Sequence, residues 1–359
     1  MDQKFLDQLL AAAVKAGASD IHLKVGAPPV FRMGGDLKEV KAPRMMPEDT
    51  RNAAILLIAN EQAREQIGTL KEYDGSYSIR DVGRFRVNIF KQRGTLECIL
   101  RVIPYGIPSF EDLGLPPVLA NICEEERGLI LVTGVTGSGK SSTLAAMIGY
   151  INNKFTRHIL TIEDPIEFLH KDAKSSISQR EIGADTESFS TALRSALRED
   201  PDVILLGEMR DYETIDIALK AAETGHLVLS TVHTQDAPKT VNRLMSVFPA
   251  DEQNMVRLRL ADTLRASVSQ RLLPCKGGSS RRVVALEIMR TTLSVRECIR
   301  DPEKISEMKQ FIESGRDQYG MVGFDQHLSE LYKAGQIELD VAKAAATNPS
   351  DFERALHFE

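Results

Sequence analysis

Short apolar runs separated by longer amphipathic stretches dominate the middle of the chain. Four such runs lie at positions 129–132, 159–162, 203–206 and 227–229. Continuous apolar runs of this length are typical of strands buried on both faces, and the stretches between them have helical spacing. Strands that alternate with helices in this way predict a parallel sheet covered by helices on both faces, which is an α/β fold.

The first hundred residues follow a different pattern, in which apolar and polar residues alternate one by one. Two such runs within 84–102 are separated by a glycine-containing turn, which predicts a β-hairpin with one buried and one polar face. If the turn centres just before Arg93, Arg101 lies on the polar face together with Arg84 and Arg86. A small mixed domain with a basic strand face is therefore expected at the N-terminus.

Helical spacing marks the start of the chain and residues 47–66, and another strand is expected over 20–25. A stretch bearing Pro and Gly then separates this region from the apolar runs and has the composition of an interdomain linker. Beyond about residue 290 the chain is mostly helical and charged. The expected division is a small domain at 1–102, a linker at 103–117, an α/β domain at 118–289 and a helical region at 290–359.

Composition places the chain among ordinary soluble proteins of about two domains. Its apolar runs are shorter than the roughly 18 residues of a membrane helix, and its first residues lack the basic cluster of an export signal. The four cysteines have no metal-ligand spacing, so we expect reduced thiols and no structural zinc. The net charge of −6 is uneven, because residues 1–102 hold 16 Lys and Arg against 13 Asp and Glu. The acidic remainder argues against a dedicated nucleic-acid-binding protein.

One segment carries a specific chemical signal. Residues 134–141 read Gly-Val-Thr-Gly-Ser-Gly-Lys-Ser, between an apolar run and a helical stretch that starts at Lys140. In such a phosphate-binding loop the glycines let backbone N–H groups turn toward phosphate oxygens, Lys140 reaches the β- and γ-phosphates, and the Ser141 hydroxyl takes Mg²⁺. The chain is therefore expected to be a nucleoside triphosphatase. The expected nucleotide contacts are Val135, Thr136, Gly137, Ser138, Gly139, Lys140, Ser141 and Ser142.

Two acids follow apolar runs at positions where such sheets bind ligands. Glu208 comes after the run at 203–206, where a Walker B element holds Mg²⁺ or orients water, and Gly207 takes the place of the usual Asp. Glu163 follows the run at 159–162, and a carboxylate there can polarise the attacking water. A solvated turn acid or a helix cap is the alternative interpretation of Glu163.

Two histidines, His226 and His233, flank the last apolar run. Either could sense the γ-phosphate or bridge subunits, although a lone histidine is more often structural. They lie in the last of four motifs, which follow one another as 134–141, 161–167, 207–211 and 224–234. In this order the motifs resemble those of the secretion-motor ATPases of type II secretion and type IV pili, which are RecA-like.

The resemblance covers nearly the whole chain. Residues 17–23 match the PAS-like domain of that family, so the resemblance implies a RecA-like parallel-sheet P-loop ATPase domain, preceded by a small PAS-like α/β domain and followed by a helical tail. Within the family the chain is similar to pilus retraction ATPases, since we expect neither a four-cysteine zinc site nor a further N-terminal domain, and residues 323–328 are retraction-like. One departure is Ser-Val-Arg-Glu-Cys-Ile-Arg at 294–300, where these enzymes usually carry Ala-Ile-Arg-Asn-Leu-Ile-Arg.

The resemblance also implies an assembly and a location. The chain is expected to form a cytoplasmic homohexamer, peripheral at the inner membrane, that binds a pilus platform protein and no nucleic acid. Paralogous pilus ATPases are further candidate partners. It would drive pilus retraction and twitching motility. The alternatives are an accessory pilus-motor paralogue, a secretion or DNA-traffic ATPase of the same family, and a nucleotide-bound regulatory scaffold without turnover.

The implied cofactors are ATP and Mg²⁺, with Ser141 and Glu208 as the metal ligands. Glu163 is the expected water-activating base and Glu208 its rival, and His226 is a further catalytic candidate. Arg86 and Arg101 match best the arginine pair with which these ATPases clasp the nucleotide, and a cationic finger adds about 10³–10⁵-fold in related enzymes. The alternative for these arginines is a solvated basic strand face.

Overall fold

The computed structural model describes residues 1–103, 106–277 and 281–358, which fall into two compact units. The first unit comprises Met1–Gly106 with two short later segments, Asp164–His170 and Arg180–Glu187, and the second comprises the remainder. Residues 104 and 105 of the expected linker lie outside the described residues. The domain boundaries expected from the sequence stay predictions.

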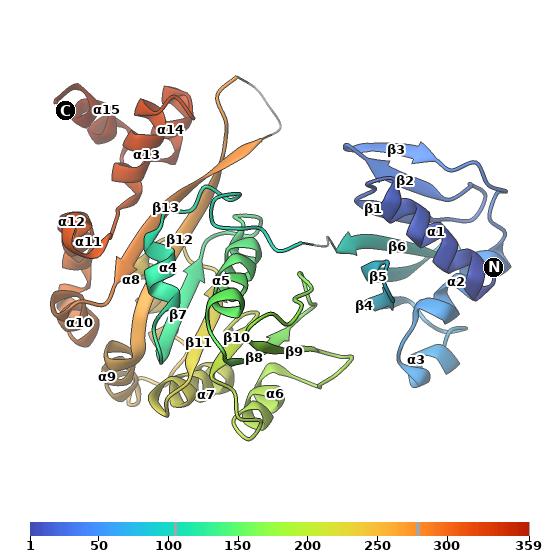
Figure 1. Cartoon of the computed structure of the whole chain (residues 1–359), viewed down its shortest axis with the longest axis horizontal. Coiled ribbons are helices and arrows are strands. Elements are labelled where there is room, and N and C mark those ends of the chain that lie inside the picture. The colour runs from blue at the N-terminus through green and yellow to red at the C-terminus, as the bar shows by residue number, and fades with distance from the viewer. Residues whose placement is uncertain (104–105, 278–280, 359) are drawn as a thin grey trace. The chain divides into compact units, whose positions relative to one another are not determined.

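The first unit is built on a six-stranded antiparallel sheet in the order β3-β2-β1-β6-β5-β4 (Figure 1). Helices α1 and α2 bury apolar side chains against the inner strands, and these contacts form the core of the unit. The elements are α1 (Gln3–Lys15), β1 (Asp20–Leu23), β2 (Val30–Met33), β3 (Asp36–Glu39), α2 (Pro47–Leu57), α3 (Glu61–Glu65), β4 (Glu72–Ile79), β5 (Gly83–Gln92) and β6 (Thr95–Ile103).

The β5–β6 hairpin has the expected two faces. Its turn centres between Arg93 and Gly94, one residue later than the sequence suggested, because both residues have positive φ, 48° and 83°. This geometry suits glycine at the second position of a two-residue turn. The later centre moves each pairing by two residues, so side chains keep their faces, and Arg86 lies directly opposite Arg101. The prediction that Arg101 shares a face with Arg84 is therefore confirmed.

The predicted helix over 47–66 is wrong in one respect, because two helices occupy this range. Helix α2 ends at Leu57, because the backbone of Ile58 is extended, and the Asn60 side chain accepts the Ala63 N–H to begin α3. Asparagine is a favoured N-cap, so the break was visible in the sequence.

The second unit is built on a seven-stranded sheet in the order β13-β12-β7-β11-β10-β8-β9. The five strands from β12 to β8 are parallel, and β13 is an antiparallel edge strand next to β12. All residues of β7, β10 and β11 are buried, as the apolar runs predict. The strands are β7 (Gly128–Thr133), β8 (His158–Glu163), β9 (Ser176–Glu181), β10 (Val203–Leu206), β11 (Leu227–Val232), β12 (Leu264–Pro274) and β13 (Arg282–Arg290).

Helices surround this sheet, and the last of them lie beside the long β12–β13 ribbon (Figure 1). There, Leu273 of β12 and Ala285 of β13 share a small core with the C-terminal helices. The helices are α4 (Val118–Cys123), α5 (Lys140–Lys154), α6 (Phe189–Ala196), α7 (Tyr212–Glu223), α8 (Ala237–Met245), α9 (Gln253–Thr263), α10 (Leu293–Arg300), the 3₁₀ helix η1 (Pro302–Glu307), α11 (Met308–Ser314), α12 (Arg316–Tyr319), α13 (Phe324–Lys333), α14 (Leu339–Ala345) and α15 (Pro349–Phe358). No helix among the described residues is both long and apolar enough to cross a membrane.

Candidate nucleotide site

The glycine-rich loop joins the buried strand β7 to helix α5. Gly134 has a φ of 142°, and a Cβ atom there would lie 2.5 Å from Ser138 Oγ and 2.6 Å from the backbone oxygen of Gln270. Gly139 is the N-cap of α5 with a φ of 91°. Residues other than glycine rarely adopt these backbone angles, and the space that a Cβ atom would need at Gly134 is already filled. The fold of the loop therefore requires glycine at both positions.

Lys140 begins α5 and is buried inside its own loop. Its side-chain nitrogen donates to the backbone oxygens of Gly134, at 3.0 Å, and Val135, at 3.1 Å. Burial lowers the pKa of Lys140, and the nearby Glu208 carboxylate acts in the opposite direction. A cation is thus held at the point where the loop curls, which is suited to an anionic ligand.

The N-terminus of α5 carries no side-chain cap. The first N–H groups of a helix have no partner within the helix and attract anions. Around them, Thr136, Gly137 and Ser141 are exposed, while Ser138 is buried and its Oγ finds no hydrogen-bond partner among the described residues. The loop therefore presents unsatisfied donors to a ligand.

Glu163 ends β8 and is 8% exposed. Its Oε1 accepts hydrogen bonds from the Thr161 hydroxyl at 2.8 Å and from Gln179 Nε2 at 3.2 Å. Two donors on one oxygen hold the carboxylate in one orientation.

Glu208 lies just beyond β10, on the same sheet edge. The Gly207 N–H donates to Ile162 O at 2.8 Å, which ties this turn to β8. The Glu208 carboxylate faces Arg210 Nε at 2.7 Å and His233 Nε2 at 3.5 Å. Burial and then the Lys140 charge lower the pKa of His233, while Glu208 opposes them. These electrostatic contacts bring Lys140, Glu208 and His233 to one site.

The structure does not bring His226 to this site. His226 precedes β11, whose first residue, Leu227, pairs with Gly128 at the start of β7. The loop leaves β7 at its other end, and the six residues of a strand span about 20 Å. His226 Nδ1 lies 3.0 Å from the Ala221 oxygen, which is a local structural contact. Because parallel strands place their carboxyl ends together, His233 was the better choice from the sequence.

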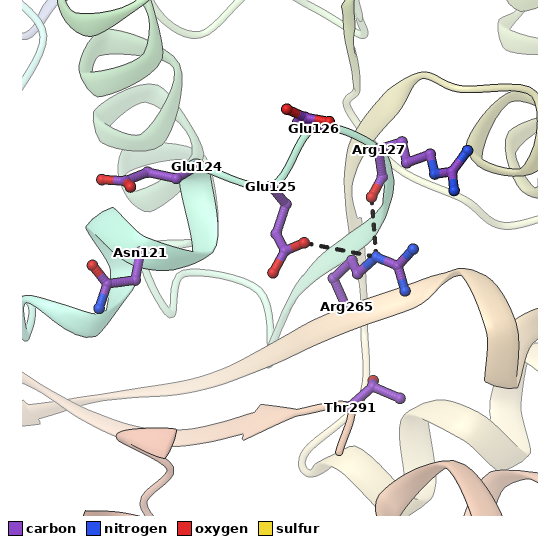
Figure 2. A pocket seen from close by; sticks show the side chains of 7 residues that line it. All are labelled: Asn121, Glu124, Glu125, Glu126, Arg127, Arg265 and Thr291. Atoms are coloured by element: carbon purple, nitrogen blue, oxygen red, sulfur yellow. Dashed lines mark hydrogen bonds and ion pairs between the residues drawn. The ribbon is translucent and has the colours of Figure 1, made fainter. Parts of the chain in front are cut away.

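A polar pocket also lies near the start of β7 (Figure 2). It is lined by acidic residues after α4 and by Arg265 of β12. Glu125 is compensated there, because its carboxylate lies 3.8 Å from Arg265 Nε and 3.4 Å from Arg290 Nη2. This pocket therefore lies at the opposite end of the sheet from the glycine-rich loop, as His226 does.

The arginines of the β5–β6 hairpin belong to the first unit. Arg84 is the most enclosed of the three, with a 16% exposed side chain that pairs with Glu181 at 2.8 Å. Arg86 is 46% exposed and lies 3.8 Å from Glu167, whereas Arg101 is 69% exposed and donates to Asp20 at 2.9 Å. Arg86 and Arg101 are therefore accessible to a ligand, whereas Arg84 is enclosed.

Sequence reasoning missed Gln270, which comes from β12. Its Nε2 donates to Thr143 of α5 at 3.0 Å, and its backbone oxygen fills the space beside Gly134. The predicted elements did not include β12, so no signal pointed to this residue.

Taken together, a RecA-like parallel sheet, a glycine loop and a buried lysine at a helix N-terminus define a P-loop nucleotide-binding protein. The sequence profile of the family "Type II/IV secretion system protein" matches residues 2–356. The chain belongs to this family.

Individual relatives match over nearly their full length. The chain is 46% identical over 347 residues to the type IV pilus retraction ATPase PilT of Pseudomonas aeruginosa, covering 97% of this chain and 99% of that one. It is 41% identical to the type IV pilus ATPase PilU of the same organism, covering 96% and 89%. A crystal structure of the pilus retraction motor PilT with bound ADP superimposes with a TM-score of 0.88 at 46% identity, covering 98% of this chain and all of that one.

Proposed function

We propose that this chain is an ATP-hydrolysing motor that drives retraction of type IV pili. The similarity to PilT over almost the whole of both chains is the observation that carries this proposal. The buried lysine and uncapped helix at the glycine loop supply the chemistry that such a motor needs. The motor would act as a homohexamer at the cytoplasmic face of the inner membrane, on the pilus platform protein.

The phosphates of ATP would bind the loop backbone and Lys140. Mg²⁺ would be held by the Ser141 hydroxyl and the Glu208 carboxylate, and it would neutralise charge on the phosphates. These residues fit that ion, because Mg²⁺ takes one or two protein oxygens and keeps water and phosphate oxygens around it. Both Glu208 oxygens already face side-chain nitrogens, those of Arg210 and His233, yet a carboxylate can accept about four bonds.

Glu163 is our candidate for the group that accepts a proton from the attacking water. Its orientation is fixed by Thr161 and Gln179, and it ends the strand next to Gly207. A positioned general base of this kind accelerates reactions by about 10²–10⁴-fold. Glu208 remains the rival, because its charge acts on Lys140.

Arg86 and Arg101 are proposed to stabilise charge that develops on the γ-phosphate bound by a neighbouring subunit. Their exposure, against the enclosed Arg84, supports this role. Arg86→Ala should reduce turnover strongly with little loss of ATP affinity. Mixed rings of Arg86→Ala and Lys140→Ala subunits should regain activity, since an intact finger can meet an intact loop. If rings shown to be mixed regain no activity, the arginines act on the nucleotide of their own subunit or are merely surface residues.

A gene deletion tests the whole proposal. A strain without this chain should assemble pili that never retract, and wild-type but not Lys140→Ala protein should restore twitching. Pili that retract normally in the deletion strain would refute a principal retraction motor. Purified wild-type protein should hydrolyse ATP, and tight ATP binding without turnover would favour the regulatory scaffold instead.

An accessory motor is the second candidate, favoured by the altered segment in α10. Val295, Cys298 and Ile299 are buried, whereas Arg300 is exposed and pairs with Asp262 at 3.0 Å. Arg296→Ala combined with Arg300→Ala removes charge and spares this apolar side. Hydrolysis should survive and twitching should fail if α10 transmits force. If both survive, the segment has lost its role and the chain is an accessory paralogue; if both fail, α10 is structural.

A further inference from the structure

One row of charged side chains runs straight across the sheet of the first unit. Arg86 of β5 lies directly opposite Arg101 of β6. Asp20 of β1 follows, with Arg101 opposite it on one side and Arg32 of β2 opposite it on the other. Side chains directly opposite each other share a face of the sheet. This row therefore places three arginines on the polar face, with Asp20 as the one acid among the four residues.

Two like charges face each other in this row. Side chains directly opposite each other on neighbouring strands are close, and like charges in such a pair destabilise a sheet. Arg86 and Arg101 nevertheless form such a pair. Exceptions to a local rule of this kind are expected where residues serve a function. An external anion would relieve the repulsion, so the pair is suited to an anionic ligand.

The Arg101 guanidinium is held through one of its three nitrogens. Its Nε donates to Asp20 Oδ1 at 2.9 Å, and the two terminal nitrogens, which carry four of the five donors, make no hydrogen bond among the described residues. Arg84 differs, because its Nη2 atom donates to Ser76 Oγ at 2.7 Å and to Glu181 Oε2 at 2.8 Å. Arg101 is thus oriented from its inner side, while its outer nitrogens can bind a ligand.

Asp20 is itself fixed in place. The residue is 6% exposed, and its Oδ2 accepts the Ser19 hydroxyl at 2.9 Å and lies 3.7 Å from Arg32 Nε. Burial acts to raise the pKa of this carboxyl, but hydrogen bonds from Arg101 and Ser19 outweigh it and lower the pKa below 3.8. A buried, charged and immobile carboxylate therefore lies beside an exposed arginine.

We propose that Asp20 is a positioning residue, which holds the Arg101 guanidinium in the orientation that stabilises charge on the nucleotide of a neighbouring subunit. The proposal rests on the role proposed above for Arg101 and adds the residue that orients it. Displacing a catalytic group by 1 Å can cost about 10²-fold in rate. Because Asp20 acts through Arg101, its loss should lower kcat and leave the KM for ATP unchanged.

Steady-state ATP hydrolysis by the full chain tests this role. Asp20→Ala should lower kcat by about 10²-fold and change KM by less than about twofold. Asp20→Asn keeps an oxygen that can accept the Arg101 Nε–H, so its kcat should fall by less than about tenfold. A wild-type kcat in Asp20→Ala would overturn the proposal.

Asp74→Ala is the matched control. It removes a carboxylate from the same sheet that also bonds to the neighbouring strand, because Asp74 Oδ1 accepts from Asn88 Nδ2 at 3.0 Å. Neither of these residues belongs to the row, so turnover should change by less than about twofold. A loss in Asp74→Ala as large as that in Asp20→Ala would refute a specific role for Asp20.

Double substitution separates positioning from a contribution to folding. Asp20→Ala should not slow Arg101→Ala further, because both substitutions act through one guanidinium. Losses that multiply in the double variant would refute positioning. If Asp20→Ala fails to fold, Asp20→Asn replaces it in the same comparison. A loss in Arg101→Ala without one in either Asp20 variant would refute positioning alone, whereas a wild-type kcat in Arg101→Ala would refute the proposed arginine role and positioning with it.

Mixed rings provide a second measurement. Asp20→Ala subunits should regain activity when mixed with Lys140→Ala subunits, since the Lys140→Ala subunits carry an intact Asp20 and Arg101 and the Asp20→Ala subunits carry an intact loop. No regained activity in rings shown to be mixed would overturn the proposal. Wild-type turnover in rings of Lys140→Ala alone would instead refute the phosphate-loop function, independently of Asp20.

Discussion

Charged side chains have different partners at the two ends of the seven-stranded sheet. At the start of β7, Glu125 faces two arginines, and Arg265 also donates to the Arg127 backbone oxygen at 3.1 Å (Figure 2). At the other end of the strand, Lys140 has only backbone oxygens as hydrogen-bond partners, and the Ser138 hydroxyl oxygen has none among the described residues. The Thr291 hydroxyl at the start of β7 also has no partner among the described residues, so the two ends differ in their charged groups and not in every polar group. A buried cation beside unsatisfied loop donors indicates the place of an anionic ligand, whereas the paired charges at the start of β7 indicate a structural role.

Lys140→Ala gives the largest expected effect, at the end of the sheet that carries the loop. Turnover should fall by about 10³-fold, because the phosphates lose a cation positioned for their charge. The thermal midpoint should change little, since Lys140 contacts backbone oxygens and no apolar core. Lys154→Ala, at the other end of the same helix, removes a lysine paired with Glu124 and should leave turnover unchanged. Steady-state turnover above about a tenth of wild type in Lys140→Ala would contradict the assignment.

Substitution of each of the two acids at this end should reduce activity in a different way. Glu163→Gln should keep ATP and Mg²⁺ binding and lose about 10²-fold in turnover, since an amide cannot accept the proton. Glu208→Gln should in addition raise the Mg²⁺ concentration needed for half-maximal turnover. Magnesium titrations of both purified variants measure this. Normal turnover in Glu163→Gln together with trapped ATP in Glu208→Gln would exchange the two roles.

A third prediction concerns pH and Glu287, which pairs with Ser269 beside the end of the sheet that carries the loop. Burial raises the pKa of this carboxyl from 4.5 to about 7, although the Ala237 N–H and the Ser269 hydroxyl oppose the shift. The folded chain therefore holds the proton more tightly than the unfolded chain between these values, and stability falls as the pH rises through them, by at most about 3 kcal/mol.

Glu287→Gln should flatten this dependence, because an amide stays neutral. The two proteins are compared by thermal unfolding between pH 5 and pH 8. The melting temperature of the wild type should fall more across that range than that of the variant. Parallel curves for the two proteins would show that Glu287 does not titrate there.

The smallest effect is expected at the start of β7. Arg265→Ala removes one of two arginines from Glu125, and the half-exposed position limits the loss of stability to about 1 kcal/mol. ATP turnover should be unchanged, because the residue lies at the far end of the sheet. A large loss of turnover without unfolding would contradict the assignment of this end of the sheet to structure alone.

Much of this architecture follows from local sequence. The runs at 203–206 and 227–229 predict buried strands because every residue in them is apolar, and the glycine loop predicts its own strand–helix setting. The long strands β12 and β13 escaped prediction because Ser, Gln and Arg interrupt the apolar residues of β12 and Glu287 interrupts those of β13. Buried Ser269 and Gln270 are tolerated there because they bond to Glu287 and Thr143, which lie far away in the sequence.

The site was only partly predictable for a related reason. Strand direction separates His233 from His226, because in a parallel sheet the residue that follows β11 lies on the side of the loop. Pairing between β5 and β6 depended on the turn at Arg93 and Gly94, where the glycine was the available signal. Partners such as Gln179 on Glu163 come from separate strands, and no local pattern records them.

The arrangement of Lys140 also has a consequence for substitution. An ammonium group has three N–H bonds, and two of them are already directed at the Gly134 and Val135 oxygens. One donor is left for a phosphate oxygen, and it can be used without releasing the other two. A planar guanidinium is wider and holds its five donors in a fixed fork. Within the same loop it cannot donate to the two backbone oxygens and to a phosphate oxygen at once. Arginine at position 140 would keep the charge and lose the fit.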